Sequence, residues 1–151
     1  QLKTRGGIAG RPAPVRWPVE RRVQRLLARA AGAGLLASAH DCSDGGFLLA
    51  LAECCASGAD AGAPLLGCDV RLAGGGAAEA LFGEAPSRVL VSVGEHDLPA
   101  FGRAARGVPW GIIGAVKPGR CTVSLGGRTV LSVPVDTLVR AREEGGKRAL
   151  G

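Results

Sequence analysis

Aromatic residues make up only 3% of this 151-residue chain, and methionine is absent. Proteins that bind single-stranded nucleic acid stack bases on aromatic side chains, so the shortage argues against that class despite a net charge of +6. No apolar run approaches the roughly 20 residues that a membrane-spanning helix needs. We therefore expect neither nucleic acid nor a membrane as a partner, and the positive charge fits anionic nucleotides and phosphate esters equally well.

The cysteines do not have the pattern of a disulfide framework or a zinc site, because there are five of them, an odd number, and no two are spaced as a CxxC motif. They are Cys42, Cys54, Cys55, Cys68 and Cys121. No signal peptide precedes them, so we expect small buried hydrophobic residues in a reducing cytoplasm, and no metal site. The chain opens on Gln1 without a methionine, and we expect it to be a fragment of a longer protein.

The length suits one domain with a real core, and 46% hydrophobic against 21% charged residues is typical of a globular protein. Residues 1–18 are rich in Gly, Pro and Arg and predict an arm or inter-domain linker. Residues 19–144 form the predicted domain, and residues 145–151 a tail. A first helix should start at Val19, expose a basic, solvated face and stop near Gly32.

One polar stretch lies between two apolar segments. It reads Ser38-Ala39-His40-Asp41-Cys42-Ser43-Asp44-Gly45-Gly46. Residues 34–39 suit a buried strand, and residues 47–56, rich in Leu and Ala, suit a nearly all-apolar helix. The sequence therefore predicts a strand, a tight turn and a helix.

The turn has the composition of an anion and metal site. Ser43 or Asp44 is the predicted N-cap, and Gly45 and Gly46 would leave the first backbone amides of the helix free to bind a phosphate. Asp41 is placed to hold a magnesium ion that bridges to that phosphate. The alternative interpretation is that the polar residues only cap the helix and the glycines only turn the chain.

A second polar cluster comprises Glu84, Ser87 and Arg88. It either holds the nucleotide site or a neighbouring domain, or it is a capped turn in which Arg88 pairs with Glu84 on the surface. His96 is expected to be an exposed loop residue.

The remaining pattern is mixed. Helices are predicted at 77–82, 97–106 and 135–144, and strands at 61–72 (broken by Pro64), 89–93, 110–116, 121–125 and 129–133, the last two joined by a Gly126-Gly127 hairpin. Alternating helices and strands followed by a hairpin indicate a mixed sheet with helices on its faces.

The polar stretch, with residues 49–53 after it, resembles the signature of the C-terminal domain of phosphoribosylformylglycinamidine synthase, in the aminoimidazole ribonucleotide (AIR) synthase-like superfamily. Further matches follow in the family's order, at residues 81–93, 107–109, 113–116 and 126–128, and the similarity runs from about Gly10 to Arg142. The resemblance implies an α+β or α/β fold, a three-layer α/β/α arrangement around a mixed sheet.

The resemblance also implies a function: an ATP-dependent ligase of purine biosynthesis that converts formylglycinamide ribonucleotide, glutamine and ATP to the amidine, ADP, phosphate and glutamate. Asp41 would be a Mg²⁺ ligand, and Ser43, Gly45 and Gly46 would contact ATP, with His40 and Asp44 supporting them. The implied partners are N-terminal domains of the same enzyme, a glutamine amidotransferase component and a phosphorylated small substrate. We expect the 151 residues alone to be inactive.

Two alternatives remain open. The chain could be a non-catalytic nucleotide-binding or assembly module. It could also be a superfamily relative of the AIR synthase, selenophosphate synthetase, thiamine-phosphate kinase or hydrogenase maturation type, although the residues from Ser43 to Gly46 are spelled differently in those relatives.

Overall fold

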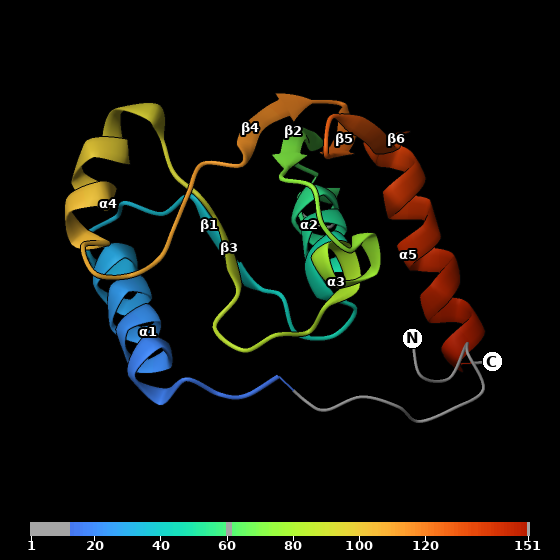
Figure 1. Ribbon diagram of the computed structural model, residues 1–151. Helices are drawn as coiled ribbons and strands as arrows, with labels where there is room; N and C mark the ends of the chain where they lie inside the picture. Colours follow the sequence, from blue (N-terminus) through green and yellow to red (C-terminus); the bar gives the residue numbers. More distant parts are fainter. Residues whose placement is uncertain (1–12, 60–61, 151) are drawn as a thin grey trace.

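The computed structural model describes residues 13–59 and 62–150 (Figure 1). Its helices are α1 (Trp17–Gly32), α2 (Gly46–Ala56), α3 (Ala77–Phe82), the 3₁₀ turn η2 (Glu95–Asp97), α4 (Leu98–Ala104) and α5 (Val135–Leu150). Its strands are β1 (Ser38–Asp41), β2 (Leu66–Leu72), β3 (Val89–Ser92), β4 (Gly114–Pro118), β5 (Arg120–Leu125) and β6 (Arg128–Pro134).

Strands β1 and β3 form an antiparallel ribbon with helices on both sides. Successive side chains of a strand point to opposite faces. Leu90 therefore packs into the main core with α2, while Val91 joins a second core with Leu26 of α1 and Phe101 of α4. Figure 1 shows α1 and α4 on one side of the ribbon and α2 on the other.

The larger sheet has the strand order β4-β2-β5-β6. Strands β2 and β5 are parallel and the other pairs are antiparallel, which confirms the predicted mixed sheet with helices. Cys68, Val70 and Val123 point to its inner face and are buried in the core that α2 and α5 cover. Its outer face carries polar residues such as Asp69 and Thr122.

The hairpin between β5 and β6 turns at Gly126 and Gly127, as predicted. Both glycines have positive φ, 56° and 81°, which is the backbone of a two-residue type I′ turn. The predicted first helix and the helices at residues 47–56 and 77–82 are also confirmed within a residue or two.

Several boundaries differ from the predictions. Strand β2 starts at Leu66, after Pro64, where a strand from residue 61 was predicted. The first strand starts at Ser38, because Leu35 and Leu36 pack as a connector against the second core. Strand β4 starts at Gly114, and the preceding Trp110 instead packs edge-on against Phe101, with ring centroids 5.5 Å apart. Helix α5 continues through residues 145–150, where a tail was predicted.

The cysteine prediction holds for four of the five residues. Cys42, Cys55, Cys68 and Cys121 are buried, while Cys54 is half-buried. None of the helices in the described part of the chain combines the length and apolarity that crossing a bilayer requires.

Candidate functional site

The predicted turn joins the end of β1 at Asp41 to the start of α2 at Gly46, and we call residues 41–46 the motif turn. The Asp41 side chain is 68% exposed, so its carboxylate is available to a ligand. A hydrogen bond from the Ser43 side chain holds the pKa of Asp41 below its ordinary value of 3.8. The carboxylate is therefore ionised at neutral pH, as a metal ligand must be.

His40 connects the end of β1 to helix α2. Its Nδ1 lies 2.7 Å from the Asp41 carbonyl oxygen, and its Nε2 lies 3.2 Å from Oε2 of Glu53. The sequence predicted a supporting role for His40 but not its contact with Glu53. A glutamate two turns into an apolar helix carries no sequence signal of such a contact.

The two glycine amides are not free, so the prediction that they stand open for a phosphate is wrong for this structure. The Gly45 N–H donates to Oε1 of Glu84 at 2.9 Å, and the Gly46 N–H donates to the Ser43 carbonyl oxygen at 3.2 Å. The predicted side-chain cap is also wrong: Gly45 is the N-cap and no side chain caps the helix, while the Asp44 side chain is exposed. An anion at this turn would have to displace the Glu84 carboxylate.

The glycines are needed for the shape of the turn. Gly45 and Gly46 have φ values of 74° and 69°, a region that other residues rarely adopt. A Cβ on Gly46 would also lie 2.6 Å from the Phe82 backbone. Close packing of the turn on the end of α3 therefore excludes any side chain at position 46.

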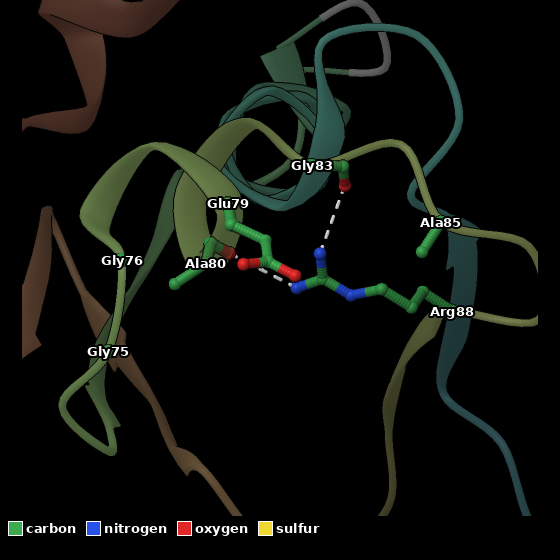
Figure 2. A pocket seen from close by; sticks show the side chains of 7 residues that line it. All are labelled: Gly75, Gly76, Glu79, Ala80, Gly83, Ala85 and Arg88. Carbon is green, nitrogen blue, oxygen red and sulfur yellow. Dashed lines mark hydrogen bonds between the residues drawn. The ribbon is translucent and has the colours of Figure 1, made fainter. Parts of the chain in front are cut away.

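Arg88 does not pair with Glu84, so the interpretation of this cluster as a surface ion pair is wrong. The Arg88 guanidinium donates to the carbonyl oxygens of Gly83 and Ala80, at 3.0 and 3.2 Å (Figure 2). It also lies 6.0 Å from the centre of the Phe47 ring at the start of α2. Arg88 thereby links the end of α3 to the start of α2.

The other two members of the cluster reach further elements. The Glu84 carboxylate binds the motif turn, and the Ser87 hydroxyl donates to the Glu20 carboxylate of α1. Ser87 has a φ of 63° and is the non-glycine residue with positive φ in the described ranges. Residues 83–88 therefore contact both the motif turn and α1.

Two hollows meet at this loop. One, of about 410 Å³, lies between α1 and the motif turn and is lined by Asp41, Ser43 and Glu84 among others. The other, of about 360 Å³, lies beside α3, where Glu79 and Arg88 line it together with Gly75 and Gly76 (Figure 2). Both volumes fall in the range of small-molecule pockets.

His96 lies in the 3₁₀ turn η2. Its side chain is 87% exposed, as predicted, and its Nε2 lies 3.1 Å from Oδ1 of Asp97.

Comparison with known families matches residues 5–126 to the model described as "AIR synthase related protein, C-terminal domain". The chain belongs to this family. The turn between β1 and α2 and the loop at residues 83–88 both lie within the residues that this model matches.

Two similar proteins are both phosphoribosylformylglycinamidine synthase subunits. The chain is 43% identical to the phosphoribosylformylglycinamidine synthase subunit PurL of Synechococcus sp. (strain WH7803), over 97% of this chain and 19% of that protein. It is 41% identical to the PurL subunit of Anaeromyxobacter dehalogenans (strain 2CP-C), over 93% of this chain and 19% of that protein. The chain thus spans about a fifth of the length of these curated relatives.

Solved structures share the fold. Thermotoga maritima PurL complexed with FGAR matches 80% of this chain and 21% of its own, with a TM-score of 0.65 and 23% identity. The same protein complexed with ATP matches 78% of this chain and 21% of its own, with the same TM-score and identity.

Proposed function

We propose that this chain is the C-terminal domain of a phosphoribosylformylglycinamidine synthase subunit. The whole enzyme would convert formylglycinamide ribonucleotide, glutamine and ATP to the amidine, ADP, phosphate and glutamate. The observation that carries the proposal is the 43% identity to a PurL subunit over 97% of the chain, motif turn included. This makes the domain part of a C–N ligase of purine biosynthesis, working in the cytoplasm.

Asp41 would hold the magnesium ion. Its carboxylate is exposed and ionised, and Glu84 lines the same groove, so the donor set consists of the oxygens that Mg²⁺ prefers. Mg²⁺ commonly binds through one or two carboxylates plus the phosphates of a substrate, and it would supply charge neutralisation for a polyphosphate. The residues present fit that ion.

Ser43, Gly45 and Gly46 would contact the nucleotide, in a protein whose Thermotoga maritima relative is described in complexes with ATP, ADP and AMPPCP. The hydrogen bond between Gly45 and Glu84 means that the amide becomes available only after this carboxylate moves. His40 would keep the strand end aligned with α2, and Asp44 would add charge beside the metal.

The catalytic unit would need more chain than these 151 residues. The partners we propose are the remaining domains of the same enzyme, a glutamine amidotransferase component that provides ammonia, and a phosphorylated small-molecule substrate. We expect no ATP-dependent amidine formation by the 151 residues alone, and any such activity would contradict the proposal.

One observation favours a second candidate, a non-catalytic nucleotide-binding or assembly module. Both glycine amides already have acceptors inside the chain, which is the arrangement of a turn that serves only the fold.

Isothermal titration of Mg-ATP separates the two candidates. In the full-length enzyme, Asp41→Ala should weaken binding about tenfold or more, equivalent to roughly 1.4 kcal/mol, because the metal loses its carboxylate. Asp69→Ala is the matched control, since Asp69 lies on the outer face of the large sheet and pairs with Arg71. Equal affinities in all three proteins would favour the assembly module.

A further inference from the structure

Three cysteines that are far apart in the sequence meet in the main core. Cys55 lies in the last turn of α2, Cys68 in β2 and Cys121 in β5. The Sγ atoms of Cys55 and Cys68 are 3.9 Å apart, and those of Cys68 and Cys121 are 3.5 Å apart. All three sulfurs lie within 4.8 Å of one another, and all three residues are buried and free of disulfides.

The topology of the sheet creates this cluster. Cys68 and Cys121 are direct partners in the parallel pairing of β2 and β5, so both side chains point to the inner face. Helix α2 packs against that face and adds the Cys55 thiol. Within the parts of the chain that the structure describes, this trio is the group of potential ligand atoms close enough to share one ion.

We propose that Cys55, Cys68 and Cys121 form a binding site for a thiophilic ion that takes three sulfur ligands. Bonds of about 2.3 Å from one central atom put three sulfurs about 3.8–4.0 Å apart in a tetrahedral or planar arrangement, and somewhat closer in a pyramidal one such as As(SR)₃. The Cys55–Cys68 separation of 3.9 Å already matches, the Cys68–Cys121 separation of 3.5 Å needs a shift of a few tenths of an ångström, and the third pair of sulfurs lies within 4.8 Å. Thiolate sulfur selects soft ions over the hard ions that prefer oxygen.

The net charge of the complete complex decides which soft ion suits this buried site. Three thiolates around Zn²⁺ would leave a net charge of −1 in an apolar interior, where an uncompensated charge is costly, and zinc also prefers a fourth ligand. Arsenite, As(OH)₃, reacts with three thiols to give a neutral As(SR)₃ adduct and three molecules of water. Three As–S bonds replace three As–O bonds, no electron is transferred, and no charge is left in the core.

Access to the trio comes from the β4 edge of the sheet. Cys68 pairs in register with Val116, whose side chain lies on the same face yet is 54% exposed. Leu66, two residues before Cys68 on this face, is 52% exposed. The inner face is therefore open to solvent one strand away from the thiols, and a small neutral molecule needs only local opening to reach them.

The test is thermal unfolding of the full-length protein with and without arsenite under reducing conditions. At an arsenite concentration one hundred times the dissociation constant, the melting temperature of this domain should rise by about 5–10 °C. The adduct should also appear in the mass spectrum as one arsenic per chain with three protons lost. Zinc at the same concentration should produce a smaller shift.

The other two cysteines provide the matched control. The double variant Cys42→Ser/Cys54→Ser keeps the trio and should keep the whole shift, although it removes the adjacent Cys54–Cys55 pair. Cys68→Ala should lose the shift and the bound arsenic, and Cys55→Ala, in a helix that tolerates alanine, checks the result if Cys68→Ala folds poorly. Arsenic retained by both alanine variants, or lost from the double serine variant, would overturn the proposal.

Discussion

The Ser43 hydroxyl donates a hydrogen bond to the Asp41 carboxylate two residues away, and this bond lowers the pKa of Asp41. Because the pKa of Asp41 is lower in the folded chain than its ordinary 3.8, the ionised form favours folding. That contribution is present at neutral pH and is lost as the pH falls from about 3.8 through the folded-state value.

Ser43→Ala should therefore raise the pKa of Asp41 towards its ordinary value. The carboxyl carbon resonance of Asp41, followed by NMR through a pH titration, measures this shift directly. Ser57→Ala is a suitable control, because the Ser57 hydroxyl bonds to the Cys54 carbonyl at the far end of α2. An unchanged Asp41 titration in Ser43→Ala would show that the hydroxyl does not hold the carboxylate.

A substitution at Gly46 tests how closely the motif turn packs against the end of α3. Gly46→Ala should destabilise the fold by about 3 kcal/mol, because it combines a positive φ with a clash against the Phe82 backbone. Gly34→Ala is the matched control: it has a φ of 68° but open space around it, so it should cost only about 1 kcal/mol. Urea unfolding of both variants measures the difference, and equal losses would mean that the clash is relieved.

At the scale of elements, residues 83–88 tie three helices together. Glu84 bonds to the turn before α2, Ser87 to α1, and Arg88 to the end of α3. Residues 83–88 therefore connect three helices through side-chain hydrogen bonds. The sequence indicated a polar cluster here but not its partners, because Gly45 lies 39 positions away from Glu84.

Glu84→Ala should release the Gly45 amide. Amide hydrogen exchange at Gly45 should become faster, and the free energy of unfolding should fall by about 1 kcal/mol, as expected for one exposed hydrogen bond to a charged group. Glu143→Ala is the control, since Glu143 is an exposed residue of α5. Unchanged exchange at Gly45 would mean that the bond to Glu84 contributes nothing to holding the turn.

At the scale of the whole molecule, local patterns predicted the elements better than their pairing. The helix at residues 47–56 and the Gly126-Gly127 hairpin follow from composition and turn chemistry over a few residues. The order β4-β2-β5-β6 does not, because it depends on contacts between residues about fifty positions apart. For the same reason the meeting of Cys55, Cys68 and Cys121 could not be predicted from their spacing.

The candidate site was predictable in part. Asp41 is exposed at a strand end, as the order of polar and apolar residues indicated. The state of the glycine amides was not predictable, because it depends on a carboxylate from another loop that happens to reach the turn. Sequence indicates which groups can bind an anion, and only the tertiary structure shows which of them already have an acceptor.

The central position of β2 has a consequence for the order in which the chain assembles during translation. Both neighbours of β2 come from the last third of the chain, β4 on one side and β5 on the other. Until the ribosome has released residues 114–125, both edges of β2 lack backbone partners and offer a template for pairing with other nascent chains. A transcript that ends before the codon for Gly114 would therefore yield an aggregation-prone product, which chaperones would have to bind or proteases degrade.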